Sequence, residues 1–316
     1  MGKIRVFGPV PSRRLGKSVG INNIPPKICT YSCVYCQLGR SFKMVADRQE
    51  YYDPNDLLLE AKEKITNAKT NNEAIDYLAI VPDGEPTLDK NLGELIELLK
   101  PLGFKVAVIT NSTLLQRPDV REDICKADWV SVKIDTLDET IWRKIDRPHK
   151  KIVFDSMLDG IKTFSREYNG QFVTETMLVR NLNDDIENIR KVAEFIREIK
   201  PSVAYLSIPI RPPAEKWVEA PEEQKINRAY QIFRDQSLTA EYLIGYEGNE
   251  FAYTGNIEED ILSITSVHPM REDGVKEYLK KANSNFSIIE KMIKENKIIV
   301  SDYNDDRFYL RKLISR

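Results

Sequence analysis

The sequence of 316 residues lacks any long hydrophobic run. Its longest apolar stretches, such as 77–81 and 106–109, fall far short of the roughly 18 residues that a membrane-spanning helix needs. The first 14 residues, MGKIRVFGPVPSRR, hold no apolar core of the kind found in a signal peptide. We therefore expect neither a membrane partner nor export, and we predict a cytoplasmic protein.

Histidine and cysteine are both scarce. The two histidines, His149 and His268, lie far apart, whereas three of the four cysteines fall within eight residues as Cys29, Cys33 and Cys36. In a cytoplasmic chain, such a cluster indicates metal binding rather than disulfides. A structural zinc site needs four Cys or His ligands, and this loop supplies three. Three thiolates instead suit a cubane iron–sulfur cluster in which one iron has no protein ligand. Three cysteines buried together by coincidence are the alternative.

Neither sign of charge dominates, because the formal net charge is only −2. The distribution is nevertheless uneven: residues 1–48 contain nine Lys or Arg and one acid, and residues 265–316 contain eleven Lys or Arg and eight acids. The middle of the chain is therefore acidic. The basic N-terminal segment predicts an anionic ligand nearby, although a solvated surface without a partner explains the charge equally well. Hydrophobic residues make up 41% of the chain, which excludes wholesale disorder.

Short apolar runs alternate with amphipathic stretches between residues 15 and 210. The predicted strands are 19–24, 75–81, 104–110, 129–134, 172–179 and 204–210. The predicted helices are 54–65, 90–100, 118–126, 138–145, 154–167 and 184–200. Asp53 and Asp138 are predicted helix N-caps. Six strands alternating with helices predict an α/β fold with a parallel sheet and right-handed crossovers, in which ligands bind at the carboxyl ends of the strands.

The segment KICTYSCVYC, residues 27–36, resembles the cluster motif of the radical S-adenosylmethionine (SAM) superfamily, including the aromatic Tyr35 before the third cysteine. The flanking segments GPVPSRRLG, residues 8–16, and QLGR, residues 37–40, are similar to a branch related to the wyosine-base-forming tRNA enzymes. The resemblance implies a partial (β/α)6 TIM-like barrel and a 4Fe-4S cluster on Cys29, Cys33 and Cys36. It also implies SAM at the open iron and reductive cleavage of SAM to a 5′-deoxyadenosyl radical.

The loop after the second predicted strand, PDGEPTL at residues 82–88, resembles the glycine–glutamate loop of that family. In the family, backbone carbonyls of this loop receive the SAM ammonium group, which implies a SAM-binding role for Gly84 and Glu85. Glycine allows the backbone to approach a ligand closely. Asp83 stands where a small residue is usual. Without the resemblance, the same residues indicate a turn and a helix cap.

Polar residues at the ends of the third and fourth strands are further SAM candidates. Asn111 is suited to the carboxylate or ribose of SAM, or else it caps a turn. The two-residue period of a strand places Ser131, Lys133 and Asp135 on one side. Because buried charges are costly without a partner, we assign Lys133 to the SAM carboxylate and Asp135 to the ribose hydroxyls or the substrate. An ion pair between the two is the alternative.

The resemblance places the adenine of SAM beside the fifth strand, where Val179 packs on the ring or serves only the core. Four side chains are candidates for contact with substrate: Arg13, Arg14, His149 and Arg211. Arg211 follows the sixth strand and suits a phosphate or carboxylate. A lone loop histidine such as His149 is equally read as a bystander.

The chain divides into a predicted radical SAM core at 1–210, an extension at 211–264 and a C-terminal module at 265–316. The extension is expected to contain a helix at 222–237 and a hairpin around 245–254. The module reads as helix, turn, helix and a two-stranded wing, which is typical of a winged helix. Such modules bind nucleic acid or protein.

The sequence therefore predicts a radical SAM enzyme. RNA, specifically tRNA, is the favoured substrate because of the wyosine-related flanks, the wing-like module and the basic N-terminal segment. An electron donor such as ferredoxin or flavodoxin is expected. The alternatives are a peptide or small-metabolite substrate, and a non-catalytic iron–sulfur sensor that binds nucleic acid. The 82–88 loop argues against the sensor, since a sensor has no need to bind SAM.

Overall fold

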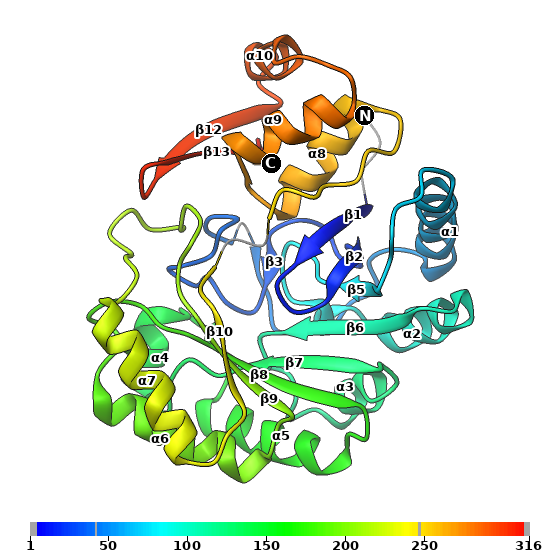
Figure 1. The fold of residues 1–316 in the computed structure, drawn as a ribbon. Helices are drawn as coiled ribbons and strands as arrows, with labels where there is room; N and C mark the ends of the chain where they lie inside the picture. Colours follow the sequence, from blue (N-terminus) through cyan, green and yellow to red (C-terminus); the bar gives the residue numbers. More distant parts are fainter. Residues whose placement is uncertain (1–4, 42, 246–247, 313–316) are drawn as a thin grey trace.

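The computed structural model describes residues 5–41, 43–245 and 248–312. Its central feature is an eight-stranded sheet with the order β1-β2-β5-β6-β7-β8-β9-β10 (Figure 1). The strands are β1 (Val6–Ser12), β2 (Gly16–Ile21), β5 (Tyr77–Ile80), β6 (Lys105–Thr110), β7 (Trp129–Lys133), β8 (Gln171–Met177), β9 (Val203–Ser207) and β10 (Ala240–Leu243). Only the β1–β2 pair is antiparallel. The six predicted strands and their parallel pairing are confirmed.

Helices connect the parallel strands and cover the outer side of the sheet (Figure 1). They are α1 (Pro54–Thr70), α2 (Leu92–Leu99), α3 (Pro118–Ile124), α4 (Glu139–Ile145), α5 (Phe154–Glu167), α6 (Ile186–Ile199) and α7 (Glu223–Asp235), with short 3₁₀ turns η1 (Pro86–Leu88) and η2 (Lys100–Leu102). Both predicted caps are confirmed, because Asp53 accepts a hydrogen bond from the Asn55 amide and Asp138 accepts two from the first turn of α4. The mixed α/β architecture is that of a partial TIM-like barrel.

The alternation of side chains divides the core into an outer and an inner part. Leu78 and Ile80 of β5 pack outward in the large core against the helices, whereas Ala79 lies on the inner face with Ala107 and Trp129. This two-residue period is the one that the sequence predicts for strands. The inner face ends at the carboxyl edge of the sheet, where the polar residues described below are found.

Both edges of the sheet depart from the prediction. β1 lies antiparallel beside β2 although its segment contains Pro9 and Pro11, which argue against a central strand but are tolerated at an edge. β10 adds to the other edge, parallel to β9. The predicted hairpin around 245–254 is wrong for the residues that are described: residues 248–256 form no strand, and residues 246–247 lie outside the described part of the chain.

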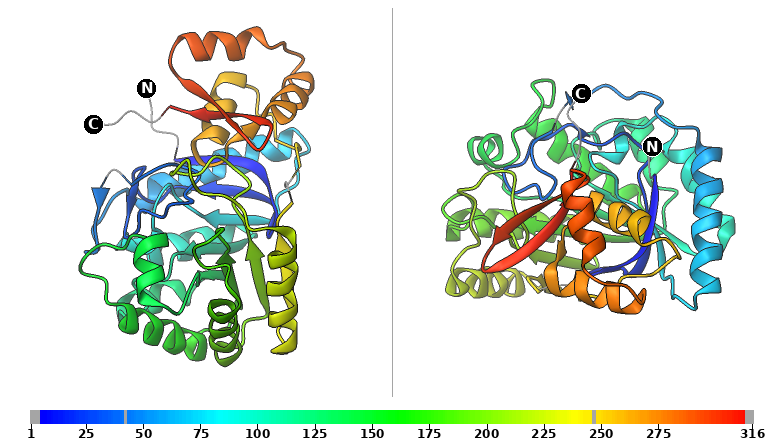
Figure 2. Two further views of the ribbon diagram at one scale, coloured as in Figure 1. Left: turned by 90° about the vertical axis from the view of Figure 1, so that its left-hand side faces the viewer. Right: turned by 90° about the horizontal axis from the view of Figure 1, so that it is seen from above.

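The C-terminal elements form a layer of their own above the sheet (Figure 2). They are α8 (Ile257–Val267), β11 (Met270–Arg271), α9 (Glu272–Lys281), α10 (Ser287–Lys294), β12 (Ile298–Tyr303) and β13 (Asp306–Arg311), and the strands pair antiparallel as β11-β13-β12. The two helices and the hairpin lie where they were predicted, and α8 precedes the expected boundary at 265. The winged-helix assignment and the domain boundaries stay predictions.

This module rests on the N-terminal strand. Phe7 and Val10 of β1 share one buried core with Ile261, Met270 and Tyr278 of the module. The module is thereby joined to the edge of the main sheet by apolar packing. Within the described residues, no helix has the length and apolarity to cross a bilayer.

Candidate active site at the carboxyl ends of the strands

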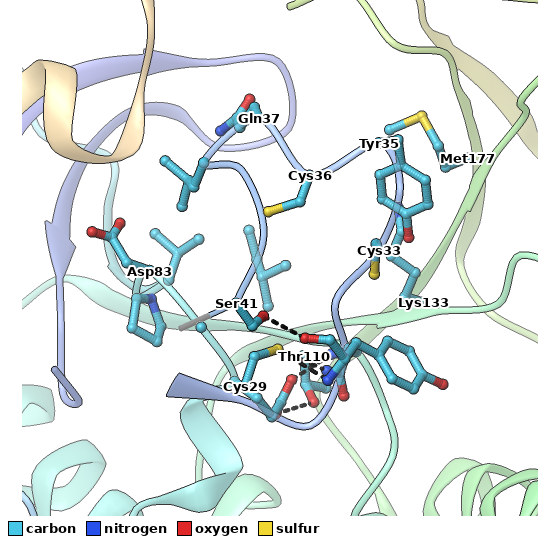
Figure 3. Close-up of a pocket in the computed structure, with 18 of the residues that line it drawn as sticks. Cys29, Cys33, Tyr35, Cys36, Gln37, Ser41, Asp83, Thr110, Lys133 and Met177 are labelled. Atoms are coloured by element: carbon cyan, nitrogen blue, oxygen red, sulfur yellow. Dashed lines mark hydrogen bonds between the residues drawn. The ribbon is translucent and has the colours of Figure 1, made fainter. Parts of the chain in front are cut away.

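A cavity of about 300 Å³ lies at the carboxyl ends of β5 to β8. Its wall includes the predicted cluster ligands Cys29, Cys33 and Cys36 (Figure 3). Among the other residues singled out in the sequence, it includes Arg13, Arg14, Tyr35, Gly84, Glu85, Asn111, Lys133 and Arg211. Thus the structure brings together one loop, four strand ends and the basic N-terminal segment, as parallel-strand topology predicts.

The three cysteines of the loop are free thiols. Burial raises the pKa of the Cys29 thiol to about 12, and the nearby Glu85 carboxyl adds to this effect. Burial and the Asp146 carboxyl raise the pKa of the Cys33 thiol well above its ordinary value. Both groups are therefore protonated until a metal displaces the proton.

The donor set fits an iron–sulfur cluster. Thiolates are the ligands that such clusters use, and three of them line one partly enclosed cavity. Nowhere in the described ranges do three or more His, Cys, Asp or Glu side chains converge on a single metal ion. Three thiols that each bind a different iron of a cluster need not converge on one point. Three thiols in one cavity wall are thus a donor set that fits such a cluster with one iron left to another ligand.

Main-chain hydrogen bonds fix the cysteine loop against distant segments. The Val34 amide donates to the Ile145 carbonyl at 2.9 Å, and the Val34 carbonyl accepts from the Glu215 amide at 3.0 Å. Next to Cys29, the short strand β3 (Ile28–Cys29) pairs with β4 (Lys43–Met44). The positions of the cysteines thus depend on backbone contacts to the end of α4 and to the loop after β9.

Gly84 joins the 82–85 loop to the cysteine loop. It forms a bridge with Ile28, and the Glu85 amide donates to the Ile28 carbonyl at 3.1 Å. A Cβ atom on residue 84 would lie only 1.9 Å from that carbonyl oxygen. Glycine is therefore required here for the close approach of two backbones, immediately before Cys29.

The Glu85 carboxylate ties the same loop to the end of β6. It accepts hydrogen bonds from the hydroxyls of Thr87 and Thr110, both at 2.6 Å, and from the amides of Thr87 at 3.1 Å and Asn111 at 2.7 Å. Burial raises the pKa of Glu85 although these donors favour the ionised form. Because four protein donors already occupy the carboxylate, it serves chiefly to position the loop. Contacts to a ligand would then come from the backbone of this loop.

Asn111 connects the end of β6 with the cysteine loop. Its side-chain amide donates to the Thr30 hydroxyl at 2.7 Å and lies 3.5 Å from the Cys29 sulfur. Its side-chain carbonyl accepts from the Thr113 hydroxyl at 2.8 Å. Asn111 is therefore both a turn residue, as the alternative reading expected, and a polar group beside the thiol of Cys29.

Lys133 lies among groups that compensate its charge. Its ammonium is 3.3 Å from Glu175, 3.9 Å from Asp135 and 4.9 Å from the centre of the Tyr35 ring. Asp135 accepts from the Tyr35 hydroxyl at 2.5 Å and from the Met177 amide at 2.7 Å. Lys133 thus reaches the cavity already paired chiefly with Glu175, a residue that was not singled out in the sequence.

Three arginines form the cationic side of the cavity. Arg14 makes an ion pair with Glu175, and burial together with the neighbouring Arg13 lowers the pKa of Arg14 to about 10. Burial lowers the pKa of Arg13 to about 10 as well. Arg211 donates to the Gln37 side chain at 2.6 Å, directly after the third cysteine. These cations favour a ligand with a negative charge.

Other singled-out residues lie away from the cavity wall. Ser131 is buried in β7, and Val179 packs with Val34 and Ile145 in a small apolar cluster. The His149 amide donates to the Thr30 carbonyl at 2.8 Å, so this residue supports the cysteine loop through its backbone. Asp135 reaches the cavity only through Tyr35 and Lys133.

Two acids beside the thiols and the arginines were missed in the sequence. Asp146 accepts from the Cys33 thiol at 3.3 Å and from Tyr35 at 3.1 Å, but a residue directly after a helix gives no signal of such a role. Glu175 did give a signal, because a charged residue within an apolar strand needs a partner. The two-residue period of that strand places it on the same side as the cavity residue Met177.

Asp83 stands apart from these networks. It is 98% buried in the cavity wall, yet neither oxygen of its carboxyl has a hydrogen-bond partner among the described residues. Burial raises its pKa to about 7, against the opposing effects of Lys27 and Arg311. Figure 3 shows Asp83 on the opposite side of the cysteines from Lys133 and Met177.

Comparisons with known proteins agree with this geometry. Residues 23–196 match the family model of the Radical SAM superfamily. A UPF0026 protein of Methanocaldococcus jannaschii is 49% identical over 98% of this chain and 97% of its own length. Among solved structures, a radical SAM methyltransferase from Sphaerobacter thermophilus has the same fold, with a TM-score of 0.54 at 14% identity over 72% of this chain and 66% of that one. A crystal structure of archaeal TYW1 gives a TM-score of 0.47 at 19% identity, over 69% of this chain and 72% of that one.

The family match covers more than half of the chain, and the archaeal relative is similar over nearly all of it. The chain therefore belongs to the Radical SAM superfamily, whose members are enzymes that bind a 4Fe-4S cluster and SAM.

Proposed function

We propose that this radical SAM enzyme modifies RNA, and that its substrate is a tRNA. The observation that carries the proposal is the cavity itself, in which three thiols meet five cationic side chains (Arg13, Arg14, Lys27, Lys133 and Arg211) against the three carboxyls of Asp83, Glu85 and Glu175. A polyanionic substrate is the class that such a wall favours. The segments flanking the cysteines, which resemble the wyosine-related branch, point to the same class.

Cys29, Cys33 and Cys36 are the proposed cluster ligands, and the open iron is left to SAM. Together the cluster and SAM supply one-electron chemistry, namely reductive cleavage of SAM and abstraction of a hydrogen atom from the substrate. The chain itself supplies the thiolates, a partly buried cavity and polar groups at the strand ends. The aromatic rings of Tyr31 and Tyr35 line the cavity next to the cysteines and reduce the access of water to the cysteine loop.

The proposed SAM contacts follow the cavity wall. Gly84 offers backbone groups beside Cys29, Asn111 offers a side-chain amide, and Lys133 offers an ammonium to the SAM carboxylate. Asp135 positions Tyr35 and Lys133, since its own oxygens accept from protein donors. Glu85 positions the loop within this wall, and Ser131 and Val179 support the wall from behind.

The proposed substrate contacts are Arg13, Arg14 and Arg211, and His149 acts through its backbone. The reducing electron is proposed to come from a ferredoxin or flavodoxin in the cytoplasm. The C-terminal module lies over the N-terminal strand that leads into Arg13 and Arg14, so it either contacts the nucleic acid or holds this strand in place.

Anaerobic reconstitution tests the chemistry. The chain loaded with iron and sulfide should convert SAM to 5′-deoxyadenosine when a reductant is added. C33A should lose both the cluster absorbance and the cleavage, whereas the matched variant C125A, which changes a cysteine outside the cavity, should keep both. A fully loaded wild-type cluster that releases no 5′-deoxyadenosine would contradict the proposal.

The substrate is tested by comparing tRNA nucleosides from a deletion strain and its parent. A nucleoside missing from the deletion strain and restored by the wild-type gene, but not by a C33A gene, is the expected result. Unchanged nucleosides, together with active SAM cleavage in vitro, would favour a peptide or a small metabolite as the substrate.

A further inference from the structure

The size of the cavity requires that most of an RNA substrate lie outside it. About 300 Å³ is at the lower end of the range for small-ligand pockets, and the proposed cluster and SAM share this cavity, so a folded RNA cannot enter it. Most of the RNA must therefore rest on a surface next to the cysteine loop. The segments that hold this loop border that surface.

Three segments with exposed side chains adjoin the cysteine loop: residues 40–41 with residue 43, residues 147–150 and residues 215–217. The first directly continues the loop, the second is attached by the hydrogen bond from the His149 amide to Thr30, and the third by the bond from the Glu215 amide to Val34. Figure 1 shows the loop after β9 lying beside the cysteine loop. We call the side chains of these segments the rim patch: Arg40, Lys43, Arg147, Lys150, Lys216 and Trp217.

The rim patch carries an excess of positive charge. Arg40 and Arg147 both pair with the single carboxylate of Glu215. Lys43, Lys150 and Lys216 are exposed, and none of them has a carboxylate partner in the described part of the chain. Two nearby acids do not offset this charge, because Asp47 pairs with Lys151 and Glu219 with Arg180.

Trp217 directly follows Lys216 in the third of these segments and has 53% of its surface exposed. Trp142 and Trp129, by comparison, are buried almost completely. Leaving an indole in water forgoes the stabilisation that its burial would bring. An exposed aromatic ring together with exposed cationic side chains, in segments attached to one loop, is the combination that binds a base and its phosphates.

We propose that the rim patch is the surface on which the RNA substrate docks, with Trp217 stacking on one base and the three unpaired lysines contacting phosphates. This inference rests on the proposed RNA substrate and locates its binding surface. An acidic electron carrier would also be attracted by the cations, and an exposed indole can anchor a protein as well as a base. The proposed RNA substrate makes RNA the occupant that we favour, and the electron carrier becomes an outcome of the test.

The first measurement is the salt dependence of binding of unfractionated tRNA to the reconstituted full chain. Each phosphate contact contributes about 0.7 to 0.9 to the slope of log affinity against log salt. The triple variant K43Q/K150Q/K216Q should therefore lower the slope by about 2 to 3. The matched triple K62Q/K90Q/K105Q changes three exposed lysines of other segments and should keep the wild-type slope. Cluster content and thermal unfolding show whether either triple has folded.

The second measurement separates stacking from charge. W217A should weaken tRNA binding about 5- to 150-fold at fixed salt, the range expected for loss of stacking on one base, without changing the salt slope. W217F should recover part of the loss. A surface that attracts RNA only by charge would show no loss with W217A.

The outcomes are distinct. If wild-type binding of tRNA depends steeply on salt and both triple variants have the same salt slope, the RNA docks elsewhere. The inference is then overturned, while the proposed function stands. If the wild type does not bind tRNA, the proposed substrate fails as well. In that case, slower reduction of the cluster by flavodoxin in K43Q/K150Q/K216Q, with unchanged reduction by dithionite, would assign the rim patch to the electron carrier and overturn the inference.

Discussion

Replacing Gly84 by alanine should both destabilise the fold and disturb the cluster site. A Cβ at this position would lie 1.9 Å from the Ile28 carbonyl oxygen, whereas ordinary contact begins at 3.4 Å, so the two loops must separate by about 1.5 Å. That movement breaks the 3.1 Å hydrogen bond from the Glu85 amide to Ile28. Overpacking costs about 1–3 kcal/mol, and an unmet buried hydrogen bond costs a similar amount, so we expect a loss of about 2–6 kcal/mol.

The loss should be visible in two independent assays. Urea unfolding of the metal-free chain gives the stability, and iron and sulfide content after reconstitution reports on Cys29, which directly follows Ile28. G245A is the control, because a Cβ there meets no atom within 4 Å, and its stability should stay within about 0.5 kcal/mol of the wild type. A G84A chain that is as stable as G245A and fully loaded with cluster would refute the reasoning.

Three further substitutions test other contacts. The pKa of Asp83 is about 7 in the fold and about 3.9 in the unfolded chain, so the folded state keeps a proton that the unfolded state loses, and stability falls between about pH 4 and pH 7. D83N should therefore be more stable than wild type at pH 8, by at most about 4 kcal/mol, and equal to it near pH 4. Urea unfolding of both chains at both pH values measures the difference. A D83N chain that is less stable than wild type at pH 8 would contradict the expectation. R14M removes one of the two cations that pair with the buried Glu175 carboxylate and leaves only Lys133. The free energy of unfolding, measured with urea at pH 7, should fall by about 3–5 kcal/mol. The double variant R14M/E175Q should recover part of this loss, because it no longer buries the unpaired charge. F7A removes a buried ring shared by β1 and the C-terminal module and should cost about 3–5 kcal/mol; a loss below about 1 kcal/mol would show that the shared core does not join them.

The central strands and helices were predictable because their signals are local. β6 and β7 are apolar runs bounded by polar residues, and Asp53 and Asp138 mark helix starts by bonding to amides two or three residues away. β1 was missed because Pro9 and Pro11 break the strand pattern, although an edge strand tolerates proline. β10 was missed because only four residues pair with β9, too few for a period to show.

The residues of the candidate site likewise comprise some that local sequence signals indicate and others that they do not. The spacing of three cysteines is a local signal, so the loop could be identified from the sequence. Asp146 lies 113 residues from Cys33 along the chain, and nothing in its neighbourhood indicates that its carboxylate meets a thiol. Lys133 was assigned to the SAM carboxylate, with an ion pair to Asp135 as the alternative; in the structure Glu175 on the adjacent strand lies closer to its ammonium than Asp135 does. Pairing between neighbouring strands decides such contacts, and a single sequence does not show it.

The cysteine loop is held by backbone hydrogen bonds as well as by side chains. Ser32 and Val34 donate from their amides to carbonyls after or at the end of α4, and these bonds form with almost any side chain. Tyr31 is different: it is buried, accepts from the Trp142 indole at 2.6 Å and donates to the Met157 sulfur at 3.1 Å. Loss of the Tyr31 hydroxyl should therefore leave the Trp142 N–H unpaired in the core. Two smaller side chains are anchored as well, because the Ser32 hydroxyl accepts from the Ser41 amide at 3.3 Å and the Thr30 hydroxyl accepts from Asn111 at 2.7 Å. The loop is thus specified by the backbones that surround it and by a few anchored side chains.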